Sequence, residues 1–161
     1  MNKCIVALLL VSVIVVAGCT SAEDAMMKNE TMMESKVYSG AVLAGSSSPV
    51  IDFNAADYQA VGQDKLVVLY FYANWCPICR AEVPEMYSAF DELATDKAVA
   101  FRVNFNDDDT DSDEVNLARQ FGVPYQHTKV FLKNSRVVLK SSESWNKNRY
   151  LFEVSKALSM P

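Results

Sequence analysis

An uncharged run of strand-forming residues leads directly into a pair of closely spaced cysteines. Residues 66–72, LVVLYFY, are rich in β-branched and aromatic side chains, which is typical of a central parallel strand covered on both faces. Cys76 and Cys79 follow this run, and apolar residues then recur at intervals of three and four as far as Leu93. The sequence therefore predicts that both thiols lie where a buried strand ends and a helix begins.

This placement gives the two cysteines different chemistry. The first turn of a helix has unpaired N–H groups and the positive end of the helix dipole, so a thiolate at Cys76 is favoured over a thiol. Pro77 fits the first turn because its missing N–H is not needed there. A spacing of three puts Cys79 one turn further inside, close enough for a disulfide. We expect Cys76 to attack and Cys79 to resolve the mixed disulfide.

Two alternatives remain for the pair, a structural disulfide and half of a zinc site. A structural zinc ion needs four ligands, mostly Cys and His, and the whole chain has four Cys and one His. Two of those cysteines, Cys4 and Cys19, belong to the N-terminal segment discussed below. The composition therefore disfavours zinc.

The remaining pattern alternates strands and helices. Expected strands are 50–53, 66–72, 99–105, 129–132 and 136–140, and expected helices are 55–61, 76–95, 115–121 and 144–158. Asn54 is a candidate helix cap, Gly122 a helix stop, and Pro84 predicts a kink. This order predicts an α/β fold with a central mixed β-sheet flanked by helices.

The first residues have the pattern of an export signal. Residues 4–17 form an uncharged run of fourteen residues after Lys3, which is short for a membrane span and typical of a signal peptide. The following Gly18-Cys19 completes a sequence, VAGC, that resembles the lipobox of prokaryotic lipoproteins. An uncleaved anchor and an ordinary signal peptide are the alternatives.

This interpretation divides the chain into three parts. Residues 1–18 are predicted to be a lipoprotein signal peptide, residues 19–36 a lipidated N-terminus and flexible tether, and residues 37–161 the folded domain. The expected location is the cell envelope, on the extracytoplasmic side of a membrane, which is the periplasmic side in a Gram-negative organism. Acylation of Cys19 would anchor the protein to the membrane.

Charge narrows the choice of partners. The chain has 15 basic and 20 acidic residues, for a formal charge of −5, and its Lys and Arg residues form no cluster. Nucleic-acid binding is therefore not expected. Residues 106–114 form an acidic loop, in which Asp107, Asp109 and Asp111 resemble the start of a calcium-binding loop. The glycine that such a loop needs is absent, which favours a solvated loop capping the next helix.

Residues 75–84, WCPICRAEVP, match the WCxxC[KR]xExP pattern of the TlpA/ResA-like, membrane-attached thioredoxins. Residues 120–123, QFGV, and the strand ending at 131–134, FLKN, resemble the second half of thioredoxins. The resemblance extends over about residues 50–160. It implies the thioredoxin fold and identifies the chain as similar to membrane-attached thiol–disulfide oxidoreductases.

The resemblance also implies how such a protein works. The nucleophile would be Cys76 and the resolving residue Cys79, with their redox-active disulfide in place of any other cofactor. Partners would be protein thiols and disulfides and a membrane or exported redox partner. The expected neighbours of the cysteines are Trp75, Pro77, Ile78 and Glu82.

Two positions depart from the family pattern. Thioredoxins have a buried Asp six residues before the first Cys, as proton acceptor for the second, and Tyr70 stands there. Glu82 or another group is left to serve instead. The family's cis-proline position holds His127, and we expect a trans peptide bond before it because a cis bond would cost about 2.5–4 kcal/mol. Gln126 could still offer backbone groups to a bound peptide, as in family members.

His127 leaves the function open between several alternatives. It is either a packing residue, a charged or acid–base partner of Cys76, or a third ligand with Cys76 and Cys79 in a Cu(I) site. The last arrangement resembles the Sco-type copper metallochaperones, whose cysteines are however spaced CxxxC. A thiol–disulfide oxidoreductase is the principal prediction, a Cu(I) metallochaperone the alternative, and a binding module without redox activity the third class.

Overall fold

The computed structural model describes residues 37–161. The predicted signal peptide, the acylated Cys19 and the tether therefore lie outside the described residues. Within residues 37–161 no helix is long and apolar enough to cross a membrane.

A six-stranded sheet forms the centre of the fold, in the order β1-β2-β4-β3-β5-β6. Its strands are β1 (Val42–Ala44), β2 (Val50–Asp52), β3 (Leu66–Tyr72), β4 (Ala98–Asn104), β5 (Thr128–Lys133) and β6 (Arg136–Ser141). Strand β4 runs parallel to β2 and β3, whereas β1 and the β5–β6 hairpin are antiparallel to their neighbours. The predicted mixed α/β sheet is confirmed.

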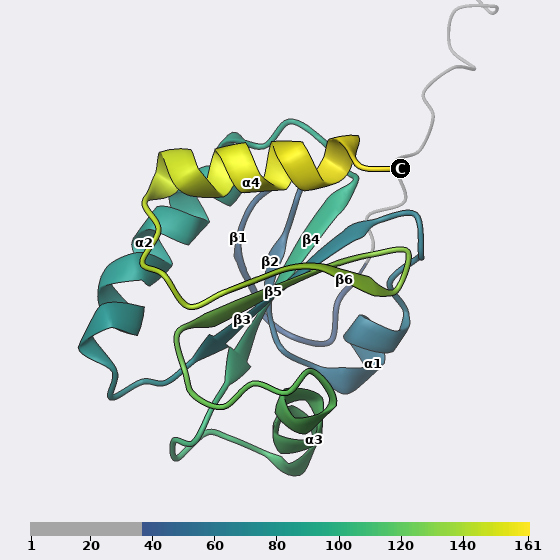
Figure 1. Cartoon of the computed structure of the whole chain (residues 1–161). Helices are drawn as coiled ribbons and strands as arrows, with labels where there is room; N and C mark the ends of the chain where they lie inside the picture. Colours follow the sequence, from purple (N-terminus) through teal and green to yellow (C-terminus); the bar gives the residue numbers. More distant parts are fainter. Residues whose placement is uncertain (1–36) are drawn as a thin grey trace, which may run out of the picture. The chain divides into compact units, whose positions relative to one another are not determined.

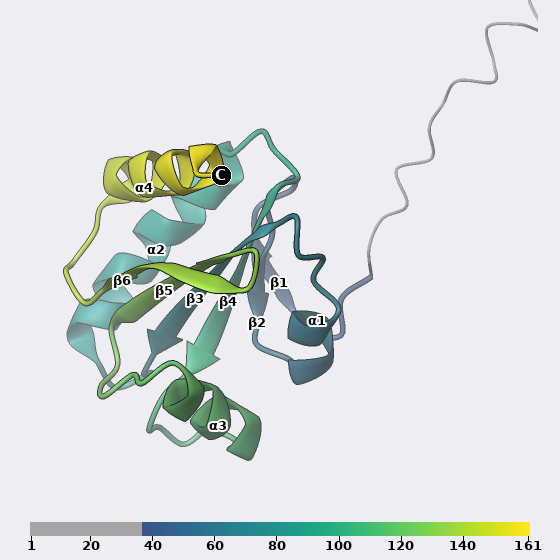
Figure 2. The same ribbon diagram turned by 45° about the vertical axis from the view of Figure 1, so that its right-hand side comes forward.

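Within residues 37–161, four helices cover the two faces of this sheet (Figures 1 and 2). They are α1 (Ala55–Gln59), α2 (Pro77–Glu92), α3 (Ser112–Gln120) and α4 (Lys147–Ser159). Helices α2 and α4 pack together on one face, and α1 and α3 lie on the other (Figure 2). The chain therefore builds a layer of helices, a sheet and a second layer of helices, with β3 near the middle.

Alternate residues of β3 point to opposite faces of the sheet. Leu66, Val68 and Tyr70 join the core beneath α2 and α4, with Phe90, Phe131, Trp145 and Tyr150 among the other members. The residues between them, Val67, Leu69 and Phe71, join the core beneath α1 and α3 with Ile51, Phe101 and Val130. All but Tyr72 of this strand is buried, as predicted for a central strand covered on both faces.

The helix ends follow the local signals of the sequence. Asn54 caps α1 by accepting the N–H groups of Ala56 and Asp57. Gly122 adopts a φ of 56° after α3, and the N–H of Val123 donates to the Ala118 carbonyl at 2.8 Å, which closes a Schellman end. Helix α2 continues through Pro84. The predicted cap and stop are confirmed.

Four elements differ from the sequence prediction by more than two residues: α2 ends at Glu92 instead of 95, α4 begins at Lys147 instead of 144, and the other two are β1 and α3. Strand β1 was not expected, because its three residues are half exposed at the sheet edge and carry no apolar alternation. Helix α3 begins at Ser112, earlier than the predicted Val115, because Asp111 and Glu114 form a capping box that fixes its first turn. The acidic loop thus ends in the helix cap, as its charge pattern suggested.

Candidate functional site

Cys76 and Cys79 lie at the junction of β3 and α2. Cys76 is the N-cap of α2, and its sulfur accepts the N–H of Cys79 at 3.3 Å. Both are thiols in this structure, Cys76 with 4% of its surface exposed and Cys79 with none. Pro77 occupies the first turn of the helix. Both cysteines are therefore buried, and they differ only slightly in exposed surface.

The residues beside Cys76 form an exposed apolar rim. Half of the surface of Trp75 and slightly more of Ile78 is open to solvent, at 50% and 53%. The indole N–H of Trp75 donates to the carbonyl of Asn106 at 3.0 Å, and the N–H of Asn74 donates to the Asp107 carboxylate at 2.9 Å. The acidic loop therefore holds the turn that presents Cys76.

Tyr70 lies behind the second cysteine, fully buried on β3. Burial, followed by the nearby Glu82 and Cys79, raises the pKa of its hydroxyl. Burial and the Cys76 thiol raise the pKa of Cys79 to about 11, against the lowering effects of the Ala73 backbone and the Tyr70 hydroxyl. Both groups are therefore neutral at rest.

His127 is buried on the loop before β5, with a φ of 66° and a trans peptide bond, since the described residues contain no cis bond. Its N–H donates to the Phe71 carbonyl at 2.7 Å, which ties the loop to the end of β3. The ring Nδ1 lies 3.2 Å from the Tyr70 hydroxyl, and Nε2 lies 3.2 Å from the Ser144 hydroxyl. Burial, and after it the charge of Lys129, lowers the pKa of the imidazole against the effect of Glu82.

Glu82 is the centre of this buried polar group. Its Oε1 accepts from the Lys129 ammonium at 2.8 Å and from the Tyr150 hydroxyl at 2.5 Å. Its Oε2 lies 3.2 Å from His127 Nε2 but, within residues 37–161, accepts no aligned hydrogen bond. Lys129 is itself fully buried and also donates to the Glu143 carbonyl. We refer to Tyr70, Glu82, His127, Lys129 and Tyr150 as the buried polar network.

The structure thus brings together most of the residues that the sequence singled out. Cys76, Cys79, Tyr70, Glu82 and His127 converge from β3, α2 and the loop before β5. Gln126, half-buried beside His127, has a place on that loop but no side-chain contact that assigns it a role. Lys129, Tyr150 and Ser144 were missed, and only the contacts between distant segments reveal them.

The copper alternative requires His127 to face both cysteines. Its two ring nitrogens face Tyr70 on one side and Ser144 with Glu82 on the other. In the part of the chain that the structure describes, no three His, Cys, Asp or Glu side chains are grouped so as to hold a metal ion. The geometry therefore gives this alternative no support.

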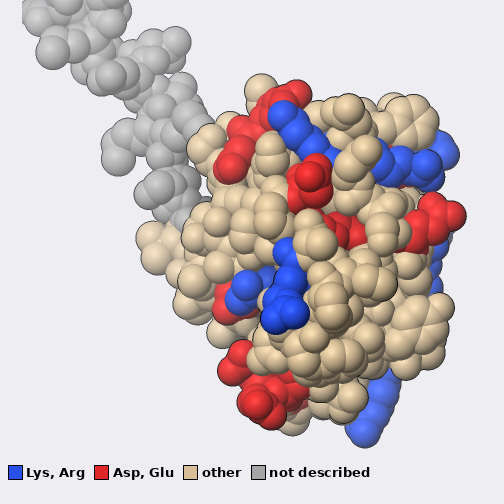
Figure 3. Space-filling model, turned by 90° about the vertical axis from the view of Figure 1, so that its left-hand side faces the viewer, with Lys and Arg blue, Asp and Glu red and all other residues tan. Residues whose placement is uncertain are grey.

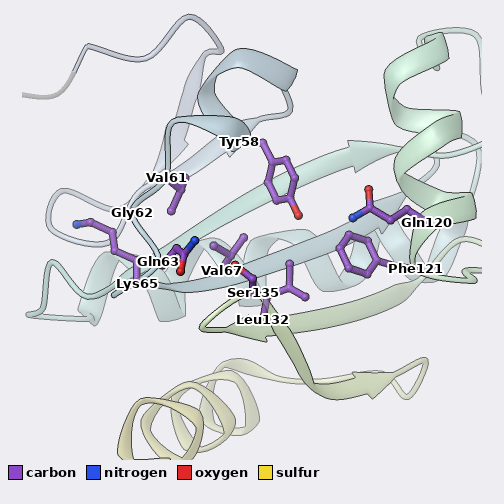
Figure 4. Close-up of a pocket in the computed structure, with 10 residues that line it drawn as sticks. All are labelled: Tyr58, Val61, Gly62, Gln63, Lys65, Val67, Gln120, Phe121, Leu132 and Ser135. Carbon is purple, nitrogen blue, oxygen red and sulfur yellow. The ribbon is translucent and has the colours of Figure 1, made fainter. Parts of the chain in front are cut away.

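A cavity of about 260 Å³ lies at the other end of β3, beneath α1 and the end of α3 (Figure 4). Its lining contains no Cys, His or acidic side chain and consists of Tyr58, Val61, Gly62, Gln63, Lys65, Val67, Gln120, Phe121, Leu132 and Ser135. It offers no reactive group comparable with the thiols.

A Cys-x-x-Cys turn between a central strand and a long helix, on a mixed sheet with a terminal hairpin, defines a thioredoxin fold. The solved structure of Trxlp from Edwardsiella tarda is 27% identical, with a TM-score of 0.54, and the match covers 64% of this chain and 96% of that one. The predicted thioredoxin fold is confirmed.

The chain belongs to the AhpC/TSA family, whose sequence pattern matches residues 47–148. Among curated relatives, Thioredoxin H4 of Arabidopsis thaliana is 37% identical over 86 residues, covering 51% of this chain and 63% of the relative. Thioredoxin-T of Drosophila melanogaster is 32% identical over 94 residues, covering 56% and 54%. The chain therefore spans less than two thirds of the length of either relative.

Proposed function

We propose that this protein is a lipid-anchored, extracytoplasmic thiol–disulfide oxidoreductase that acts on protein thiols and disulfides through Cys76 and Cys79. The observation that carries the proposal is the position of the Cys76 sulfur, at the N-cap of α2 with the N–H of Cys79 directed at it. Backbone N–H groups at a helix start stabilise a thiolate. The family membership supports the same activity.

The exchange proceeds in two balanced steps. The Cys76 thiolate attacks one sulfur of a substrate disulfide, forming a mixed disulfide and releasing the other substrate sulfur as a thiolate. Cys79 then loses its proton and attacks the Cys76 sulfur, which breaks the mixed disulfide and releases the second thiolate. The substrate gains two electrons and the protein keeps a Cys76–Cys79 disulfide. An external membrane or exported dithiol partner returns the pair to thiols, and the reverse sequence oxidises a substrate.

The surface around Cys76 suits a polypeptide substrate rather than a nucleic acid. Trp75, Ile78 and Tyr125 are each about half exposed, at 50%, 53% and 53%. Figure 3 views the side on which α2 begins, and its charges form small groups of both signs around a broad uncharged area. An extended peptide could contact this area, with backbone groups of Gln126 as pairing partners.

The proposed location rests on the first nineteen residues. An uncharged run followed by Val16-Ala17-Gly18-Cys19 supports cleavage before Cys19 and acylation of its sulfur. The tether of residues 19–36 would then join the membrane to the folded domain. An oxidising compartment outside the cytoplasm suits a cysteine pair that alternates between dithiol and disulfide.

The activity is tested in the full chain carrying Cys4→Ser and Cys19→Ser, so that Cys76 and Cys79 are the only thiols. Replacing Cys76 with Ser should abolish reduction of a protein disulfide such as that of insulin. Replacing Cys79 with Ser should leave a stable mixed disulfide with the substrate, visible by mass spectrometry. Faster alkylation of Cys79 than of Cys76 in the starting protein would reverse the assigned roles.

The anchor is tested separately, with the natural N-terminus in a bacterial host. The wild type should partition into detergent and lose residues 1–18, whereas Cys19→Ala should block acylation and processing. An intact protein with an unmodified Cys19 and Met1 still attached would overturn the lipoprotein assignment without affecting the exchange activity.

A further inference from the structure

The resolving step needs a base that the sequence does not supply in the usual place. Cys79 has no exposed surface, and burial raises the pKa of its thiol to about 11. Solvent water therefore has no direct route to the thiol proton. The residue six positions before Cys76 is Tyr70 instead of a carboxylate. A buried phenol that takes the thiol proton must pass its own proton to another group, because it cannot hold the extra positive charge.

The Tyr70 hydroxyl does have the geometry to pass a proton on. It is near enough to Cys79 to affect the pKa of the thiol, and it lies 3.2 Å from His127 Nδ1. A hydroxyl is both a donor and an acceptor, so it can take a proton from sulfur while giving its own to nitrogen. Because burial raises the pKa of Tyr70, a free phenolate is disfavoured and the hydroxyl serves only as a link.

His127 is held in position to receive this proton. Its φ of 66° is uncommon for a residue with a side chain, and the N–H bond to Phe71 keeps the backbone there. Burial and the charge of Lys129 lower the pKa of the imidazole, so the ring is neutral and Nδ1 is free to accept. The otherwise unpartnered Glu82 Oε2 lies 3.2 Å from Nε2, where an imidazolium would need a negative charge.

We propose that His127 is the proton acceptor for Cys79, and that the Tyr70 hydroxyl relays the proton between them. The Cys79 S–H gives its proton to the Tyr70 oxygen while the Tyr70 O–H proton moves to His127 Nδ1. Tyr70 is unchanged, Cys79 becomes a thiolate and His127 an imidazolium beside Glu82. The thiolate attacks Cys76, the electron pair of the broken S–S bond leaves on the substrate sulfur, and His127 releases its proton to solvent.

The charges around the ring determine how the relay depends on pH. Glu82 from α2 stabilises the imidazolium, and Lys129 from β5 opposes it. The hydroxyls of Tyr70 and Ser144 face the two ring nitrogens, and Tyr150 from α4 and the backbone carbonyl of Glu143 contact the Glu82–Lys129 pair. The relay rests on the proposed function, because it assigns a role only within the resolving step.

The test distinguishes the reaction of Cys76 from the later reaction of Cys79. The full chain carrying Cys4→Ser and Cys19→Ser, fully reduced, is mixed with an aromatic disulfide whose thiolate product absorbs visible light. Attack by Cys76 releases one thiolate per protein, and resolution by Cys79 releases a second. Tyr70→Phe keeps the ring, over which the Lys129 ammonium lies at 5.4 Å, and removes only the hydroxyl. His127→Asn removes the base and tolerates a positive φ.

Both variants should leave the first release unchanged and slow the second by at least about tenfold at neutral pH, equivalent to about 1.4 kcal/mol. Their second phase should also level off at a higher pH than in the starting protein, because Cys79 must then ionise unaided. The double variant should be no slower than the worse single variant, since the two groups act in series. Tyr87→Phe, a control on α2 whose hydroxyl contacts Arg102, should change neither phase.

An unchanged second phase in both variants would overturn the relay. So would an equal slowing of both phases at every pH, which is the pattern of a distorted site, or additive losses in the double variant. A starting protein that releases no thiolate in the first phase would instead overturn the proposed oxidoreductase function. The two failures are therefore distinguishable within one experiment.

Discussion

The two faces of the central sheet share the same strands but bury different chemistry. Beneath α1 and α3 the core is aliphatic and aromatic, and the ring of Phe101 meets those of Phe53 and Tyr58 edge to face or nearly so, at centroid distances of 6.1 and 5.8 Å. Beneath α2 and α4 the core includes the buried Glu82–Lys129 pair. The buried acids of the first face, Asp57 and Glu114, accept backbone N–H groups, whereas the second face buries an anion and a cation as a pair.

This difference indicates a division of labour between the faces. Apolar burial is the main favourable contribution to folding, and a buried ion pair contributes little net stability because desolvation offsets its attraction. The Glu82–Lys129 pair lies on the α2–α4 face with the cysteines, whereas the buried acids of the α1–α3 face are held by backbone N–H groups. We infer that the α1–α3 face chiefly holds the fold and that the α2–α4 face keeps groups for the cysteine chemistry. Substitutions on both faces test this inference.

The largest loss of stability is expected on the apolar face. Phe101→Ala should lower the free energy of unfolding by about 3–5 kcal/mol, because it leaves a cavity between β4 and α1. The loss should be the same from mildly acidic to mildly alkaline pH, since burial raises the pKa of Tyr58, the titratable group whose ring meets Phe101, above its usual value of 10.0. Denaturant unfolding at several pH values measures it, and a loss that varied strongly with pH would contradict the division.

Lys129→Met on the other face should cost about 3 kcal/mol, the lower end of the range for removing one partner of a buried pair. The lower end applies because His127 also lies 3.2 Å from the remaining Glu82 carboxylate. The loss should shrink as the pH falls, since His127, whose pKa the Lys129 charge no longer lowers, becomes charged and pairs with the Glu82 carboxylate. Adding Glu82→Gln to Lys129→Met should recover part of the loss, and failure to recover any would show that the charge is not its cause.

These two positions also show what the sequence could and could not predict. The cysteine spacing, the apolar run of β3 and the helix caps are local, so Cys76, Cys79 and the ends of α1 and α3 were predictable. In the sequence, Lys129 is a charged residue at the start of an expected strand, and nothing indicates that it is buried. It is buried because the β3–β5 register pairs it with Tyr70. The local sequence of neither strand determines that register.

Tyr70 and His127 stood out only as departures from a family pattern. Each alone marked only a missing family residue, a carboxylate in one case and a proline in the other. Tyr70 and His127 are 57 residues apart in the sequence. They come together because the N–H of His127 donates to the Phe71 carbonyl at the end of β3. Sequence periodicity predicts on which face of an element a residue lies. It does not predict which residue of a distant segment contacts it there.

A smaller effect is expected from Glu114, the buried carboxyl of α3. Burial raises its pKa to about 7, although the N–H groups of Asn104 and Asp111 donate to the carboxylate. The folded state therefore holds the proton more tightly than the unfolded state, so stability falls as the pH rises from the unfolded value of 4.5 toward 7. From about pH 5 to about pH 6 this group should cost roughly 1 kcal/mol.

The measurement compares denaturant unfolding of the wild type and Glu114→Gln across that range. The difference between them should move in favour of the variant as the pH rises. A difference that stays constant, or that moves in favour of the wild type, would mean that the two donated hydrogen bonds outweigh burial.

The smallest effect compares two residues that share an unusual backbone conformation. Ser135, in the β5–β6 turn, has a φ of 60°, and His127, beside the cysteines, has a φ of 66°. A side chain in this region costs roughly 1–2 kcal/mol, and glycine avoids most of that cost while loosening the unfolded chain. Ser135→Gly should therefore stabilise the protein by about 0.5 kcal/mol, measured by thermal unfolding, and leave exchange activity unchanged.

His127→Gly gains the same backbone relief, but it also removes the ring that contacts Tyr70, Ser144 and Glu82. Those buried groups would lose their partner, and an unpaired buried polar group costs about 1–3 kcal/mol. We therefore expect the same substitution to stabilise the turn and to destabilise the site. If both glycine variants gained stability equally, the ring contacts would contribute nothing to the folded state. The positive φ of His127 would then not serve to position the buried polar network. The inference that the α2–α4 face keeps groups for the cysteine chemistry would fail.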